Sequence, residues 1–397
     1  MSVEGWKTGK LRDITVINYG KSPVKILSPE GQYPVVGTGE TERLGTNFLY
    51  DGESIILGRK GSIDRVYFAS GKFWAIDTAY YLSDFRETFP RWLFYYLQTI
   101  DLRQMNEATG VPSLSREFLY NIALQIPAKA EQTQIATILS TIDRAIEQTE
   151  ALIAKQQRIK TGLMQDLLTK GIDENGNIRS EETHEFKDSP LGRIPVEWEV
   201  VTTGQVTKSL VPGRDKPDLD GGGVPWITIP DIEGMYLDLP KSGLSLSLNA
   251  IKVANARLMP KGTVLMSCVG EFGIATITEC DAVANQQLHG FICDQSILPE
   301  WLIAQINASG NRIDNMATQT TIKYLNKNGC ESILITLPSL KEQVKIISIL
   351  DNINDLFEKQ KKSLNKLRSL KTGLMQDLLT GKVRVTELIK ERETDNL

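Results

Sequence analysis

The side chains best suited to chemistry in this 397-residue sequence stand in polar stretches, several of them beside glycine-rich turns. Arg and Lys can pair with guanine in the major groove of DNA, and Asn and Gln can pair with adenine. We predict contacts with DNA for Thr38, Arg43, Arg59, Lys60, Ser62 and Arg65, and for Arg214, Lys216, Gln286, Gln287, Thr320 and Lys323. A phosphate contact is favoured for Lys60, and Arg59 is left open between a guanine contact and a phosphate contact. The alternative for each is a solvated loop residue or a turn cap, and Asn285, Gln286 and Gln287 could instead brace the fold.

Motifs for catalysis are missing from the sequence. It contains no GxxxxGK[ST] phosphate loop, no strand-linked GxGxxG and no GxSxG elbow. Asp231, Asp238 and Lys241 faintly resemble a metal nuclease site, but the lysine stands three positions after the aspartate rather than two, which favours chance spacing. His289 is expected to be a structural histidine. We therefore predict no catalytic residue, no metal site and no cofactor of the chain's own.

Cysteine usage and hydropathy bear on the compartment. The four cysteines form no CxxC pair, so neither a zinc site nor a disulfide framework is indicated. No apolar run approaches the ~20 residues of a membrane span, and the first residues do not resemble a signal peptide. We expect a cytoplasmic protein without a membrane partner.

Net charge limits how the chain could bind nucleic acid. The chain carries a net charge of −4, whereas a nucleic-acid binder that acts alone usually presents a basic surface. Binding to DNA would therefore require local clusters of basic residues, or positive surface from partner proteins.

The elements that must position these residues are organised by a repeat. The decapeptide KTGLMQDLLT occurs at 160–169 and again at 371–380, an offset of 211. Pro127, Glu131 and Gln132 recur at the same offset as Pro338, Glu342 and Gln343. Between these landmarks, apolar residues alternate at spacings of four and three, which predicts two long helices that pair through one seam. The pairing residues are predicted to include Ile135, Leu139, Ile142, Ile146, Ile346, Leu350, Ile353, Phe357, Leu364 and Leu367.

The remaining chain divides around these helices. We predict globular α/β domains at 1–127 and 196–338, helical segments at 128–170 and 339–381, a linker at 171–195 and a charged tail at 382–397. In the first domain, strands are expected at 54–57, 66–69 and 121–126, and a helix at 91–105. The fold class is α+β, with an internal pseudo-two-fold repeat.

The sequence resembles the specificity subunits of type I restriction–modification systems along essentially its whole length. The strongest matches are the two segments that combine a proline with Glu-Gln, and the two copies of KTGLMQDLLT. Further matches are YPVVG at 33–37, ILGRKGSI at 56–63 and FWAIDT at 73–78, followed by VPWI at 224–227, PKGTVL at 260–265 and NQQ at 285–287.

This resemblance implies two target recognition domains, each reading one half of a split sequence in double-stranded DNA. It implies that the two helices pair antiparallel as a coiled coil, fix the separation of the half-sites and dock two modification subunits. Those partners bind S-adenosylmethionine and methylate adenine, and restriction subunits add an ATP-dependent translocase and endonuclease. The chain itself is then not an enzyme. No base contact transfers residue by residue, because the variable domains share no recognition code.

Two other functions stay open. The chain could serve as the specificity subunit of a type II-like enzyme that cuts outside its site. It could also be a coiled-coil scaffold with two protein-binding heads and no DNA role, which the acidic second domain favours slightly. A self-contained nuclease or methyltransferase lacks every expected cofactor motif.

Overall fold

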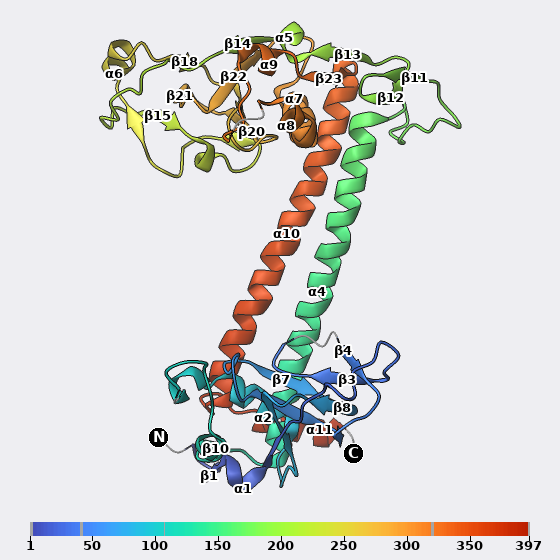
Figure 1. Ribbon diagram of the computed structural model, residues 1–397, viewed down its shortest axis with the longest axis vertical. Coiled ribbons are helices and arrows are strands. Elements are labelled where there is room, and N and C mark those ends of the chain that lie inside the picture. Colours follow the sequence, from blue (N-terminus) through green and yellow to red (C-terminus); the bar gives the residue numbers. More distant parts are fainter. Residues whose placement is uncertain (1–2, 40–42, 107, 319–320, 396–397) are drawn as a thin grey trace. The chain divides into compact units, whose positions relative to one another are not determined.

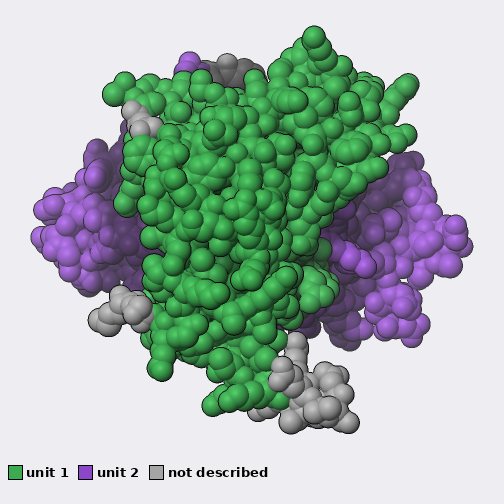
Figure 2. All heavy atoms as spheres, turned by 90° about the horizontal axis from the view of Figure 1, so that it is seen from below, with its two compact units in different colours: residues 1–152, 360–397 green, residues 153–359 purple. Residues whose placement is uncertain are grey.

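The computed structural model describes residues 3–39, 43–106, 108–318 and 321–395. The chain forms two compact units, one of residues 1–152 with 360–397 and one of residues 153–359 (Figure 2). Each unit therefore holds one globular domain with one end of each long helix, α4 (Lys129–Thr169) and α10 (Leu340–Leu379) (Figure 1). Within the described residues, no helix is both long enough and apolar enough to span a bilayer.

The first unit is built on two four-stranded sheets. One has the order β2-β9-β6-β7, comprising β2 (Val16–Tyr19), β9 (Ala79–Ser83), β6 (Ser54–Gly58) and β7 (Val66–Ala69). The other has the order β4-β3-β8-β5, comprising β4 (Arg43–Gly45), β3 (Tyr33–Val36), β8 (Lys72–Ala75) and β5 (Tyr50–Asp51). A separate antiparallel pair joins β1 (Lys7–Lys10) to β10 (Ala123–Ile126), which leads into α4. The strands expected at 54–57 and 66–69 are confirmed.

Short helices cover this unit: α1 (Leu11–Ile14), α2 (Pro90–Gln98), the 3-10 turn η1 (Leu102–Met105) and α3 (Arg116–Tyr120). The single helix expected at 91–105 is wrong, because the α-helix ends at Gln98. The Asp101 side chain then accepts a hydrogen bond from the Arg103 amide and starts a new turn. The strand expected at 121–126 begins only at Ala123, because Asn121 caps the C-terminus of α3.

The second unit repeats this plan with additions. Its larger sheet has the order β14-β22-β19-β20-β16, comprising β14 (Thr207–Leu210), β22 (Leu288–Cys293), β19 (Val264–Ser267), β20 (Ala275–Thr278) and β16 (Tyr236–Leu237). Its smaller sheet has the order β17-β15-β21-β18, comprising β17 (Ser245–Leu246), β15 (Val224–Ile227), β21 (Ala282–Ala284) and β18 (Leu258–Met259). Here β13 (Glu199–Thr202) pairs with β23 (Leu334–Leu337), which leads into α10 as β10 leads into α4.

Helices of the second unit follow the same order: α5 (Thr203–Val206), α7 (Pro299–Ala308), α8 (Gly310–Met316) and α9 (Lys327–Glu331). The additional elements are the 3-10 turn η2 (Ile229–Asp231), the strand β16 and the helix α6 (Leu248–Val253). They lie in the part of the domain that is longer than its counterpart.

Two segments differ from expectation because each carries apolar residues that the core takes up. The stretch 171–195, expected as a linker, contains the hairpin β11 (Phe186–Ser189) and β12 (Gly192–Pro195). Its Ile172 and Ile194 are buried in the core of the second unit. The end of the chain, expected as a tail, forms α11 (Thr386–Asp395), and Val385 and Ile389 pack in the core of the first unit.

The two long helices contact each other antiparallel inside each unit. In the first unit, Asp143 pairs with Lys371 at 2.6 Å and Glu150 pairs with Arg368 at 2.7 Å. Residue numbers on α10 therefore fall as those on α4 rise, which makes the pair antiparallel. In the second unit, the Lys160 ammonium lies 5.4 Å from the centre of the Phe357 ring. Every residue that we named for helix pairing is buried or half-buried.

Candidate functional site

The start of each long helix is fastened to its domain by a glutamine. Gln132 Nε2 donates to the Pro127 carbonyl at 2.9 Å, and its Oε1 accepts from the Phe89 amide at 2.7 Å. Gln343 repeats this arrangement with the Pro338 carbonyl at 2.9 Å and the Leu298 amide at 2.8 Å. Both side chains are buried, so these bonds satisfy backbone groups that water cannot reach. The repeated glutamine is therefore explained by a structural role.

The glutamate before each glutamine sits at the centre of a charged cluster. In the first unit, Glu131 accepts from the Trp6 indole N–H at 3.0 Å and from Arg384 Nε at 2.7 Å. In the second unit, Glu342 accepts from the Trp198 indole at 3.1 Å and from Arg179 Nη2 at 3.2 Å. We call these the Trp–Glu–Arg clusters. Each joins the beginning of a domain, the beginning of one long helix and the segment that follows the other.

Sequence reasoning missed the two arginines of these clusters. Arg179 follows the first decapeptide by ten positions and Arg384 follows the second by four, so they do not align at the common offset. The glutamates align at the common offset of 211, whereas Trp6 and Trp198 each stand one position before the first strand of their domain's β1–β10 or β13–β23 pair. The available signal is an arginine within about ten residues after each decapeptide, which could pair with the glutamate that recurs at the 211-residue offset.

In the first unit, the predicted residues around Arg59 lie on a tight turn. A Cβ on Gly58 would come within 2.2 Å of the Ser62 carbonyl oxygen, and Gly61 has φ +83°, which only glycine adopts easily. A second loop, 109–114, crosses beside this turn, with the Gly61 amide donating to the Pro112 carbonyl at 2.9 Å and Leu114 donating to the Arg59 carbonyl at 3.0 Å. We call the turn 58–63 and the loop 109–114 the first loop pair.

The structure places the predicted residues of this half as follows. Lys60 and Ser62 are exposed on the first loop pair, and Thr38 Oγ1 donates to the Ser62 carbonyl at 3.0 Å. Arg65 is exposed just before β7, whereas Arg43 is exposed on β4 in the other sheet. Thr38, Arg59, Lys60 and Ser62 are therefore brought together, and nothing links Arg43 to them among the described contacts.

The second unit builds an equivalent loop pair with different side chains. Gly270 donates to the Lys323 carbonyl at 2.9 Å, and Leu325 donates to the Cys268 carbonyl at 2.9 Å. The Lys323 ammonium is 2.5 Å from the Asp314 carboxylate, so part of its charge is already balanced. Thr320, predicted as a contact, lies outside the described residues.

The glutamines of this half act partly as braces. Gln286 Nε2 donates to the Gly213 carbonyl at 2.9 Å and so holds the loop that carries the exposed Arg214 and Lys216. Asn285 Nδ2 donates to Gln287 Oε1 at 3.2 Å. The alternative reading of 285–287 as a brace thus describes the contacts that these side chains make, although Gln286 and Gln287 remain exposed.

Two candidates for catalysis have structural roles. His289 is buried with Nε2 3.0 Å from Ser209 Oγ, and burial lowers its pKa to about 4, so it is neutral at pH 7. Burial alone would raise the pKa of Asp231, but hydrogen bonds, among them those from Thr228 and Ser242, lower it. Lys241 pairs instead with Glu233. His289 is therefore buried and hydrogen-bonded, as expected of a structural histidine, while Asp231 and Lys241 contact different partners.

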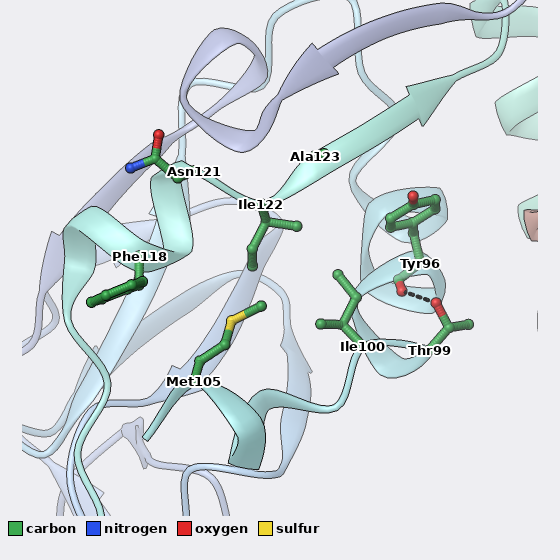
Figure 3. A pocket seen from close by; sticks show the side chains of 8 residues that line it. All are labelled: Tyr96, Thr99, Ile100, Met105, Phe118, Asn121, Ile122 and Ala123. Carbon is green, nitrogen blue, oxygen red and sulfur yellow. Dashed lines mark hydrogen bonds between the residues drawn. The ribbon is translucent and has the colours of Figure 1, made fainter. Parts of the chain in front are cut away.

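A surface hollow of about 390 Å³ marks the far end of α2 in the first unit. Figure 3 shows Ile100, Met105 and Ile122 converging on it, with Thr99 hydrogen-bonded to the Tyr96 carbonyl. In the second unit, Arg312 donates from Nη2 to the carbonyl of Leu334, the first residue of the strand that matches β10, at 2.6 Å. A side chain thus reaches the beginning of this strand in the second unit, whereas in the first unit Ala123, at the same position of β10, borders the hollow.

Comparison with known proteins decides the family. Residues 3–156 and 195–369 match the family described as the type I restriction modification DNA specificity domain. The chain belongs to the specificity subunits of type I restriction–modification systems. This match spans both domains and most of both long helices.

Individual relatives agree with this assignment. The chain is 26% identical to the MjaVIII specificity subunit of Methanocaldococcus jannaschii, over 97% of this chain and 94% of the relative. It is 20% identical to the EcoDI specificity subunit of Escherichia coli, over 96% and 88%. The type I S subunit from M. genitalium has the same fold, with a TM-score of 0.62, 16% identity and coverage of 96% of this chain and 99% of that one.

Proposed function

We propose that this specificity subunit recognises a bipartite site on double-stranded DNA, and that each domain reads one half. Family membership carries the proposal. It is supported by the two loop pairs, which share backbone hydrogen bonds while differing in side chains. A constant frame with variable side chains lets equivalent positions read different base pairs. In this proposal residues 1–127 and 196–338 are the target recognition domains, and the twelve predicted residues are candidates for their DNA contacts.

We further propose that α4 and α10 form a two-stranded coiled coil whose length sets the separation of the half-sites. Antiparallel ion pairs in the first unit, and apolar seam residues that are buried or half-buried in both units, support this proposal. An antiparallel pair also suits a pseudo-two-fold arrangement, which would match the local dyad of duplex DNA.

Catalysis in this proposal belongs to partners. Two modification subunits bind S-adenosylmethionine and methylate adenine, and restriction subunits supply ATP-dependent translocation and cleavage. Exposed apolar side chains on the long helices support a protein interface there: Leu152 and Leu370 in the first unit, and Ile159 and Leu356 in the second.

A domain exchange tests whether each domain recognises one half of the DNA site independently. Residues 1–125 are replaced by the equivalent domain of another specificity subunit, and methylated sites are mapped in cells that contain the modification subunits. One half of the recognition sequence should change while the other persists. Change in both halves, or in neither, contradicts independent reading.

A change of helix length tests the spacer. One heptad added to both α4 and α10 lengthens each helix by about 10 Å, which is roughly three base pairs at 3.4 Å each. The preferred spacer should lengthen while both half-sites keep their sequences. The matched control inserts seven residues in the exposed turn 174–177, which carries none of the predicted DNA contacts, and the half-site separation should then stay constant.

A further inference from the structure

Three segments of the first unit converge on one tyrosine ring that the sequence did not single out. Tyr19 ends β2 and remains 45% exposed. The guanidinium of Arg59, from the turn 58–63, lies 5.1 Å from the centre of the Tyr19 ring. The guanidinium of Arg116, from the first turn of α3, lies 4.8 Å from the same centre. Two cations therefore share one exposed aromatic platform.

Neither guanidinium has a carboxylate partner among the ion pairs of the described residues. Arg59 Nη1 donates to the Asp77 backbone carbonyl at 3.0 Å, which fixes its position and leaves its charge unbalanced. The neighbouring Arg12 behaves differently, because it pairs with Glu117 while lying 5.9 Å from the centre of the Tyr120 ring. Because both guanidinium groups lie near the same ring centre, at 5.1 Å and 4.8 Å, these two positive charges are close to each other. An anion bound between them would relieve this repulsion.

We propose that Tyr19, Arg59 and Arg116 form a cradle for a backbone phosphate of double-stranded DNA. Arginine forks match the geometry of phosphate oxygens, and a ring beneath each guanidinium holds it in place while its N–H groups face outward. This inference rests on the proposed function and assigns Arg59 to the DNA backbone rather than to a base edge. The cradle would set the position of the first loop pair, and the exposed Lys60 and Ser62 would lie beside it.

The second unit lacks this chemistry at equivalent positions. Tyr19 stands five positions after the end of α1, and Val211 stands five positions after the end of α5, so Val211 takes the place of Tyr19. The strand pairing agrees, because Val16 pairs with Ser83 as Lys208 pairs with Ile292. The backbone contact that Arg59 makes with Leu114 is made there by Cys268 with Leu325. Lys327 takes the first position of α9, as Arg116 does in α3, and it pairs with Glu331 at 3.5 Å. The cradle therefore belongs to the first domain alone.

Salt-dependent binding of the full chain, assembled with its modification subunits, tests the cradle. The probes are one duplex that contains a site methylated by the complex and one unrelated duplex of equal length. Each phosphate contact contributes about 0.9 to the slope of log affinity against log salt. One contact therefore changes the affinity by roughly eightfold between 1 M and 0.1 M salt. Arg59→Gln and Arg116→Gln should each weaken both duplexes about equally and reduce the slope by about one. Arg12→Gln removes the same charge from a balanced pair and should leave the slope unchanged.

Specific outcomes separate the cradle from the broader function. Weakening confined to the specific duplex would overturn the cradle and assign the arginine to a base. Full affinity and an unchanged slope in both variants would overturn the cradle and leave the DNA function standing. If the unaltered complex binds neither duplex, the proposed function fails as well.

The platform is tested separately, without relying on loss of charge. Tyr19→Phe should retain the slope because the ring remains, whereas Tyr19→Val, which introduces the residue type of the second unit, should reduce it. If any variant fails to fold, arginine modification by a dicarbonyl reagent on the unaltered protein still decides. DNA should protect Arg59 and Arg116 and leave Arg12 unaffected. Equal reactivity with and without DNA at Arg59 and Arg116 would overturn the proposal.

Discussion

The two units share their internal fastenings and differ at their loop pairs. The Trp–Glu–Arg cluster and the buried glutamine recur with nearly the same distances in both. At the loop pairs, the backbone hydrogen bonds also recur, yet Arg59 in one unit corresponds to Cys268 in the other. Repetition is therefore kept where a domain must join the long helices, and side chains diverge where the surface is free to recognise something else.

The same comparison explains why the decapeptide is repeated without change. Leu167 and Leu168 of the first copy are buried in the core of the second unit, and Leu378 and Leu379 of the second copy are buried in the core of the first. Each copy meets a similar docking surface, made by the beginning of the other helix and its domain. A change in either copy would have to fit both a domain core and the helix seam.

The largest effect is expected in the Trp–Glu–Arg clusters. Glu342→Gln would leave Arg179, whose side chain is only 11% exposed, without its carboxylate. Removing one partner of a buried ion pair destabilises a protein by roughly 3–5 kcal/mol. Glu131→Gln should cost less, because the side chain of Arg384 is 31% exposed and can reach water. Urea unfolding gives the total, and hydrogen exchange on peptides assigns the loss to one unit.

A glutamate outside the Trp–Glu–Arg clusters serves as the control. Glu150→Gln lies on α4 and breaks an exposed pair, so it should change exchange rates little. A larger loss for Glu131→Gln than for Glu342→Gln would contradict the idea that burial of the arginine decides the difference.

Equal effects are expected at the helix seam. Leu139 and Leu350 stand at the repeat offset and are buried in the cores of the first and second unit. Replacement of either by Ala should destabilise its unit by roughly 2–5 kcal/mol through lost transfer energy and a cavity. Thermal and urea unfolding measure both. Leu356→Ala, at a side chain that is 50% exposed, is the control and should stay within about 0.5 kcal/mol.

The sequence predicted the long helices and their seam because helical periodicity is local. Ile142 and Ile353 each belong to a row of apolar residues that lies on one face of its helix, and this spacing can be read without knowing how the domains fold. The loop pairs could not be predicted in this way. The contact between Gly61 and Pro112 joins segments far apart in the chain, and no periodic pattern links them. For the same reason Arg116 was missed, although Arg59 was found beside its glycines.

Boundaries were less predictable than elements. Apolar periodicity runs past Gln98, so only the capping bond at Asp101 reveals that α2 has ended. In 171–195 the charged residues outnumber Ile172 and Ile194, which conceals that both are buried. Composition averages over a stretch, whereas a core selects individual side chains.

A pH effect should distinguish the two units. Burial lowers the pKa of His289 to about 4 in the folded state, below its ordinary value of 6.5. The unfolded chain therefore takes up a proton first as pH falls, and stability of the second unit declines from about pH 6.5 until His289 itself protonates near pH 4. The loss at pH 5 should be on the order of 2 kcal/mol. Hydrogen exchange at pH 7 and pH 5, corrected for intrinsic rates, measures it in each unit.

His289→Asn serves as the matched variant for this effect, because it removes the titrating ring and keeps a polar group near Ser209. Its second unit should be less stable at pH 7 and should lose less between pH 7 and pH 5 than the parent. An unchanged pH dependence in the variant would assign the acid sensitivity to other groups.

The smallest effect is expected where the helices meet in water. Arg368 and Glu150 lie 2.7 Å apart in the first unit, but their side chains are 56% and 44% exposed, so solvent screens the attraction. Arg368→Gln should change the stability of that unit by less than about 1 kcal/mol. Lys371 and Asp143, with both side chains 25% exposed, are the more buried pair on the same two helices, and Lys371→Gln should cost more. A double-mutant cycle for each pair at low and high salt separates coupling from the effect of each substitution. Coupling at Arg368 should vanish in high salt, while coupling at Lys371 should persist because less water reaches it. If both couplings vanish alike, the seam is as wet as the helix surface, and its apolar residues alone hold the helices together.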